Sequence, residues 1–113
     1  MEPAVRAYID AIAPENRPLF DRIHGLILSA HPEAEVVLSY DLPTYRTPGH
    51  RLHLGAWRHG VSLYGWQRGR DAGFVARHPE LLHGKATLRL RPDDAAGMSD
   101  DELREFVTAA LAD

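Results

Sequence analysis

The runs Leu52-His53-Leu54-Gly55-Ala56-Trp57 and Val61-Ser62-Leu63-Tyr64-Gly65-Trp66 decide the fold of this chain. In both runs an apolar residue recurs at every second position, which is the period of a half-buried β-strand. The connection Arg58-His59-Gly60 is short and holds a glycine that can take a positive φ, as many hairpin turns require. The two runs therefore predict a β-hairpin.

A two-residue turn at His59-Gly60 would set the register of this hairpin and place His53 opposite Trp66. In that register the leucines of both strands lie together on one face, so the two alternations agree. We expect Leu54 and Leu63 to be buried, and His53 and Arg58 to be more exposed.

The segments before and after the hairpin have the residue spacing of helices. Apolar residues at i, i+3, i+4 and i+7 predict one helix over Val5–Ile12 and a second over Asn16–Ala30. A capping box at Ser99-Asp100-Asp101-Glu102 opens a C-terminal helix. Residues Glu33–Leu38 are expected to form a further short helix, because acids at its start complement the helix dipole.

A third strand is predicted over Lys85–Arg91, where apolar and basic residues alternate and Pro92 ends the run. The stretch Gln67–His83 is expected to be a loop with one or two short helical turns. These elements indicate the α+β class, with an antiparallel sheet flanked by N-terminal helices and a C-terminal helix. We expect residues 1–113 to form a compact single domain.

Composition excludes several functions. The 113 residues contain no cysteine, which rules out disulfides, thiolate zinc sites and cysteine nucleophiles. The formal net charge of −3 argues against broad binding to nucleic acid. No apolar run is long enough to span a membrane and the N-terminus does not read as a secretory signal. We therefore expect a cytoplasmic protein with neither a nucleic-acid nor a membrane partner.

A candidate binding surface lies on the polar face of the predicted sheet. Period-two alternation places Lys85, Arg89 and Arg91 on one face of the third strand. If this strand joins the hairpin, the three cations share a surface with Tyr64 and Trp66. Cations beside aromatic rings suit a small anionic ligand, through charge, hydrogen bonds and stacking. The alternative interpretation is a solvated sheet face without a ligand.

The segment Ser39-Tyr40-Asp41-Leu42-Pro43-Thr44-Tyr45 is expected at the rim of this surface, where Pro43 rigidifies it. The preceding acid, Glu35, is expected to pair with Lys85 or Arg89, because two neighbouring cations repel each other unless an acid or an anion compensates. The six candidate ligand-binding residues are Glu35, Tyr40, Pro43, Tyr64, Lys85 and Arg89.

Metal binding and catalysis have weaker sequence support. The seven histidines lack the helical spacing of a zinc motif. The acids Asp93, Asp94, Asp100, Asp101, Glu102 and Glu105 cluster near the last helix and could bind a hard cation, although helix N-termini also attract such acids. An enzyme ranks below a binding protein, because neither a nucleophile nor an acid–base pair has diagnostic spacing.

The order of the motifs resembles the YdhG-like family of small, mostly bacterial domains of unknown function. The resemblance rests on Pro32-Glu33-Ala34-Glu35, Ser39-Tyr40-Asp41-Leu42-Pro43, Val61-Ser62-Leu63-Tyr64 and Gly84-Lys85-Ala86-Thr87-Leu88-Arg89-Leu90. It implies a compact α+β fold with an antiparallel sheet. One branch of the family is described as a frataxin-like iron chaperone. The alternative function that the resemblance implies is therefore an iron-binding metallochaperone, with iron held by acidic residues.

Overall fold

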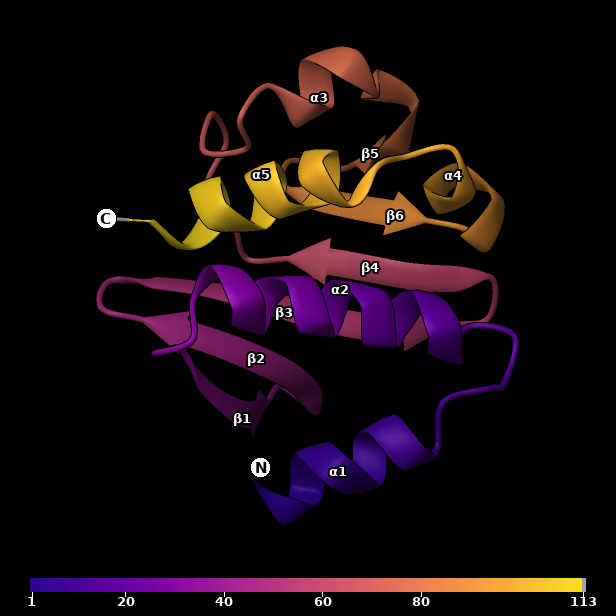
Figure 1. Cartoon of the computed structure of the whole chain (residues 1–113), viewed down its shortest axis with the longest axis vertical. Helices are drawn as coiled ribbons and strands as arrows, with labels where there is room; N and C mark the ends of the chain where they lie inside the picture. The colour runs from indigo at the N-terminus through magenta and orange to yellow at the C-terminus, as the bar shows by residue number, and fades with distance from the viewer. Residues whose placement is uncertain (113) are drawn as a thin grey trace.

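The structure, a computed structural model that describes residues 1–112, has an α+β fold in which helices cover one face of a six-stranded antiparallel sheet (Figure 1). The strand order is β1-β2-β3-β4-β6-β5. The elements are α1 (Pro3–Asp10), α2 (Arg17–Ala30), β1 (Glu35–Ser39), β2 (Leu42–Thr47), β3 (His50–Trp57), β4 (Gly60–Tyr64), α3 (Phe74–Arg77), a 3-10 turn (Pro79–Leu81), β5 (Leu82–His83), β6 (Thr87–Leu90), α4 (Pro92–Ala96) and α5 (Asp100–Leu111).

The core lies between the sheet and the helices α2 and α5, which Figure 1 shows side by side in front of the strands. Leu54 of β3 and Leu63 of β4 are buried, as the alternation predicted. The predicted apolar face of α5 is also confirmed, because its residues Leu103, Phe106 and Val107 are buried. Fully burying a side chain of this kind contributes about 1.5–3 kcal/mol, so these contacts dominate the stability of the fold.

The hairpin forms as predicted, but its register differs by two residues. Trp57 pairs with Gly60, so the two-residue turn is Arg58-His59 rather than His59-Gly60. The side-chain amide of Asn16, a buried residue at the start of α2, donates hydrogen bonds to the carbonyls of Trp57 and Arg58, at 2.9 and 3.3 Å. This tertiary contact stabilises a turn that lies one residue earlier in the chain than predicted. A two-residue shift leaves each side chain on its predicted face.

Gly60 is required for a different reason from the one predicted. Its φ is not positive, and it lies at the start of β4 where β6 approaches closely. A Cβ atom built on Gly60 would lie 2.0 Å from the carbonyl oxygen of Leu90. The close pairing of β4 with β6 therefore depends on the absence of a side chain at this position.

Residues 33–38 were predicted to be helical, and this prediction was wrong: Glu35–Ser39 is strand β1, paired with β2. The acids before the apolar residues resembled a helix start, but the alternation of Val36 and Leu38 toward the helices determines the structure. The β1–β2 turn is made by Tyr40 and Asp41, both with positive φ (53° and 60°), which matches the twist of the two strands.

The β2 strand begins its pairing with β3 at Thr44, directly after Pro43. Proline has no backbone N–H to donate, so it stands where the β2–β3 ladder ends rather than within it. Beyond this point the hydroxyl of Tyr8 in α1 accepts a hydrogen bond from the N–H of Ala56, at 2.9 Å. A side chain of α1 thus accepts a β3 hydrogen bond beyond the end of the β2–β3 ladder.

The third predicted strand is shorter than expected. Strand β6 covers Thr87–Leu90, and Lys85 lies in the turn that joins β5 to β6. The Gln67–His83 stretch contains two short helical turns as predicted, α3 and the 3-10 turn, but its last two residues form strand β5 rather than loop. Half of the predicted capping box of α5 is present: the Ser99 hydroxyl accepts the N–H of Glu102 at 3.1 Å, whereas the Glu102 carboxylate binds Arg77.

Within residues 1–112, every helix is too short or too polar to cross a membrane.

Replacing Gly60 by alanine should lower the free energy of unfolding by about 1–3 kcal/mol, because the new methyl group collides with the β6 backbone. The matched control is Gly25→Ala at an exposed position in α2, where a Cβ meets nothing within 4 Å. That change should raise the free energy of unfolding by about 0.5–1 kcal/mol. Urea unfolding measures both, and a Gly60→Ala variant as stable as the parent would contradict the close approach.

Candidate functional site

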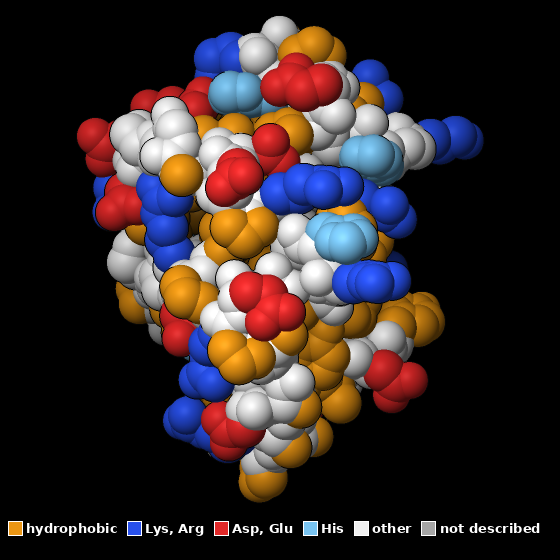
Figure 2. Space-filling view, turned by 90° about the vertical axis from the view of Figure 1, so that its right-hand side faces the viewer, with side chains coloured by type: hydrophobic (Ala, Val, Ile, Leu, Met, Phe, Trp, Pro, Cys, Tyr) orange, Lys and Arg blue, Asp and Glu red, His pale blue; other side chains and the backbone are white. Residues whose placement is uncertain are grey.

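The face of the sheet opposite α2 and α5, which we call the open face, carries most of the residues that the sequence nominated. Directly paired residues of antiparallel strands project to the same face. Glu35 pairs with Arg46, Arg46 with Arg51, and Ser62 with Arg89. All of these except Ser62 are exposed. Figure 2 shows basic and histidine side chains along its upper right margin, where the open face is seen in profile.

One end of the open face is built around Trp57, the last residue of β3. The guanidinium carbons of Arg89 and Arg91 lie 5.2 and 5.8 Å from the centroid of its indole ring. The ring of His59 meets the same indole edge-on, with centroids 5.2 Å apart. Neither arginine has an ion-pair partner within residues 1–112, so the indole is the group that holds both cations.

A recess of about 390 Å³ opens beside this cluster, and we call it the tryptophan recess. Leu81 and His83 complete its wall, and two acids, Glu80 and Asp94, also line it. The carboxylate of Asp94 accepts the backbone N–H of Arg91 at 2.9 Å. With histidine neutral, the two acids balance the charges of the two arginines, so the recess has a formal charge near zero. Arg89 and Arg91 can each bind an anionic group, while Glu80 and Asp94 limit how much negative charge the recess accepts.

Two buried polar atoms beneath this cluster lack hydrogen-bond partners in the described part of the chain. They are the indole N–H of Trp57 and the hydroxyl of Ser62, which is 1% exposed and lies directly opposite Arg89. A buried polar group without a partner costs about 1–3 kcal/mol. A bound water or a ligand group could supply the missing contacts.

The middle of the open face is aromatic. Tyr40 is 79% exposed, and its ring meets that of His53 edge-on at 5.9 Å. His53 was expected to be exposed, but it is buried, and its Nδ1 lies 2.6 Å from the hydroxyl oxygen of Thr44. Burial lowers the pKa of His53, and the nearby charge of Arg51 lowers it further. The neutral imidazole is therefore favoured in the folded protein.

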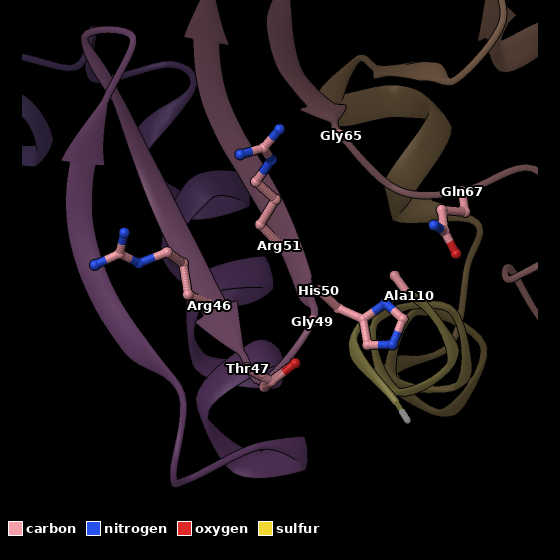
Figure 3. A pocket seen from close by; sticks show the side chains of 8 residues that line it. All are labelled: Arg46, Thr47, Gly49, His50, Arg51, Gly65, Gln67 and Ala110. Atoms are coloured by element: carbon pink, nitrogen blue, oxygen red, sulfur yellow. The ribbon is translucent and has the colours of Figure 1, made fainter.

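At the other end, a second cleft of about 370 Å³ lies between β2, β3 and the chain that leaves β4 (Figure 3). We call it the arginine cleft, because Arg46 and Arg51 line it together with Thr47, His50 and Gln67. In Figure 3 the two arginines project from adjacent strands, while His50 projects toward α5. The open face thus has two basic ends separated by an aromatic middle.

The structure brings together some of the six predicted residues but not all of them. Tyr64 and Arg89 share the open face, because Tyr64 lies two residues from Ser62 on β4. Lys85 lies in a turn, where its carbonyl accepts the Arg68 guanidinium at 3.2 Å. Pro43 pairs with Leu38 and is buried on the opposite, core side of the sheet.

Two further expectations about this surface were wrong. Glu35 forms an ion pair with Arg46 on the neighbouring strand, not with Lys85 or Arg89. Trp66 is not on the basic surface, because the chain turns at Gly65 (φ 84°) and buries the indole against Phe106, with centroids 5.5 Å apart. The aromatic ring beside the arginines is that of Trp57, and not that of Trp66 as predicted.

Sequence reasoning missed Trp57 and the Arg46–Arg51 pair. The signal for Trp57 was its position at the end of an alternating strand, on the same side as the polar residues. Arg46 lies in β2, a strand that the sequence did not predict, and Arg51 lies in β3 one residue before the predicted run, so their pairing was not visible without the β2–β3 register.

Two of the acids proposed for iron binding form ion pairs with arginines. Asp100 pairs with Arg22 at 2.7 Å, and Glu102 pairs with Arg77 at 2.7 Å. The hydrogen bond from Arg77 is the main reason that the pKa of Glu102 is lowered. Within residues 1–112, no three histidine, aspartate or glutamate side chains converge as a metal site would require. Asp100 and Glu102 therefore link α5 to α2 and α3.

No match was found when the chain was compared with protein-family models, with curated proteins or with solved structures. The resemblance to the YdhG-like family stays a prediction.

The lowered pKa of His53 predicts how stability depends on pH. The unfolded chain takes up a proton on this residue below about pH 6.5, before the folded chain does. The free energy of unfolding should therefore fall as the pH drops from about 7 to about 5. In His53→Gln this fall should be smaller, because glutamine does not titrate. The pKa of His24 is also lowered by burial, so His24→Gln should reduce the fall as well.

Urea unfolding at a series of pH values measures the effect. The comparison uses the slope of stability with pH, so a general loss of stability in either variant does not affect the outcome. An undiminished fall in the double variant would contradict the assignment of these two neutral histidines.

Proposed function

We propose that this protein binds a small anionic ligand in the tryptophan recess of the open face. The observation that carries the proposal is the pair of guanidinium groups, Arg89 and Arg91, held by the indole of Trp57 without an ion-pair partner within residues 1–112. Unpaired arginines fixed on a rigid sheet are suited to recognising an anion, because less freedom is lost on binding.

The ligand best matched to the recess is a carboxylate attached to a flat apolar group. A guanidinium binds a carboxylate through its N–H edge, whereas it contacts an aromatic ring through its face. Arg89 can therefore keep its contact with Trp57 and still bind the ligand. Leu81 and the indole supply an apolar wall, and the acids Glu80 and Asp94 disfavour a second negative charge.

The open face carries a hydroxyl–histidine pair, Thr44 and His53, and its burial favours binding over catalysis. Thr44 is fully buried, and its hydroxyl lies within hydrogen-bond distance of the Leu42 carbonyl at 3.0 Å as well as of His53. A nucleophile needs access to its substrate, and this hydroxyl has none. The iron-chaperone alternative is less well supported, since Asp100 and Glu102 are already paired with arginines.

The test uses benzoate as the probe, titrated into the protein while the indole N–H signal of Trp57 is followed by NMR. Arg89→Gln should weaken benzoate binding at least about tenfold, because one charge-assisted hydrogen-bonding group is lost. Arg89→Lys keeps the charge but loses the two-pronged geometry, so its affinity should lie between the two.

Arg6→Gln, an exposed position on α1, is the control and should bind as the parent does. Far-UV circular dichroism checks that each variant is folded. Equal benzoate affinity in Arg89→Gln and the parent would refute the proposed site.

A further inference from the structure

We infer that the arginine cleft is a second, separate binding site, for a compact dianion of the phosphate class. This site does not depend on the proposed function of the tryptophan recess. The first reason is electrostatic. Arg46 and Arg51 lie directly opposite each other in the β2–β3 register, and like charges at such positions destabilise a sheet. A pair of this kind is stabilised when an anion binds between its members.

Only one of these two charges is compensated within residues 1–112. Glu35, opposite Arg46 on β1, forms an ion pair with it, whereas Arg51 has no ion-pair partner there. The row Glu35–Arg46–Arg51 therefore carries one excess positive charge. Glu35 and Arg46 are both exposed, so their ion pair is weak and an incoming anion can displace the carboxylate.

The second reason is the shape of the chain beside Arg51. Continuing the β3–β4 register by two residues would place Trp66 opposite Arg51 and cover it. Instead, Gly65 turns the chain with a φ of 84°, and Trp66 is buried against Phe106. The space that a longer β4 would have filled becomes the arginine cleft, with Gly65 and Gln67 on its far wall.

Figure 3 shows the resulting arrangement. The guanidinium groups of Arg46 and Arg51 point away from each other, while Gln67 and His50 lie on the side of α5. The guanidinium of Arg46 turns toward Glu35 on β1, with which it forms an ion pair, and so lies apart from that of Arg51. Long arginine side chains at exposed positions can turn inward when an anion arrives, so that both contribute hydrogen bonds to its oxygens.

The two ends of the open face differ in the charge they accept. Glu80 and Asp94 line the tryptophan recess, whereas none of the described residues that line the arginine cleft is acidic. A dianion is therefore favoured at the cleft and disfavoured at the recess. The ligand is either free phosphate or the phosphate group of a small ester, since both present the same oxygens.

The experiment is an NMR titration of the protein with inorganic phosphate, and in parallel with phenyl phosphate, at constant ionic strength and at a pH where both are mainly dianionic. The backbone N–H signals of Gly49 and Gly65, which line the cleft, should shift with saturation. Arg51→Gln should weaken binding at least about tenfold. Glu35→Gln should strengthen it several-fold, because Arg46 is released from its carboxylate. Tighter binding of the ester would identify esterified phosphate as the ligand, and equal binding would identify the free ion.

Arg6→Gln is again the control and should leave phosphate affinity unchanged. Arg89→Gln separates the two sites: it should remove benzoate binding but not the phosphate-induced shifts at Gly49 and Gly65. The inference is overturned if Arg51→Gln binds phosphate as the parent does. It is also overturned if phosphate shifts only signals around Trp57, or if Arg89→Gln is the variant that abolishes phosphate binding.

Discussion

The pairing of β3 with β4 is the constraint on which the rest of the structure depends. Setting Leu54 opposite Leu63 directs the apolar side of both strands toward α2 and α5, where these residues are buried. The same register places Trp57 opposite Gly60, at the edge of the open face. One pairing therefore produces both the core and the position of the aromatic ring at the candidate site.

The approach of β6 to β4 converts this position into a basic aromatic cluster. Gly60 allows the two backbones to come close, and the pairing of Ser62 with Arg89 brings the cations of β6 to the open face. Because no side chain stands at Gly60, the indole of Trp57 and the guanidinium of Arg91 meet across it. A change in sheet spacing at Gly60 would thus affect stability and the ligand surface together.

Much of the fold could be predicted from period alone. The alternation of leucines identified the hairpin, and helical spacing identified the face of α5 that contains Leu103 and Phe106. The errors arose where a tertiary contact decided the structure. Asn16 shifted the hairpin turn, and its hydrogen bonds link residues more than forty positions apart. The strand β1 was misread because acids before Val36 resemble a helix start until the pairing with β2 is known.

The candidate site was less predictable than the fold, for a related reason. The alternation of residues along its strand predicted which face of the sheet Arg89 projects from, and this prediction was correct. The aromatic partner of Arg89 was not predicted correctly, because contacts between strands depend on their register. A two-residue shift of register replaces one aromatic neighbour by another. The Arg46–Arg51 pair depends on two registers and a turn, which no local pattern specifies.

Quenching of Trp57 fluorescence by iodide and by caesium at equal ionic strength reports the sign of the charge around its indole ring. Trp66 is buried, so charged quenchers report mainly on Trp57. The chain carries a net charge of −3, which by itself attracts caesium and repels iodide. With each quencher scaled to its quenching of free tryptophan, iodide should quench Trp57 more strongly than caesium if Arg89 and Arg91 make the open face an anion-binding surface. Equal scaled quenching, or stronger scaled quenching by caesium, would contradict the account.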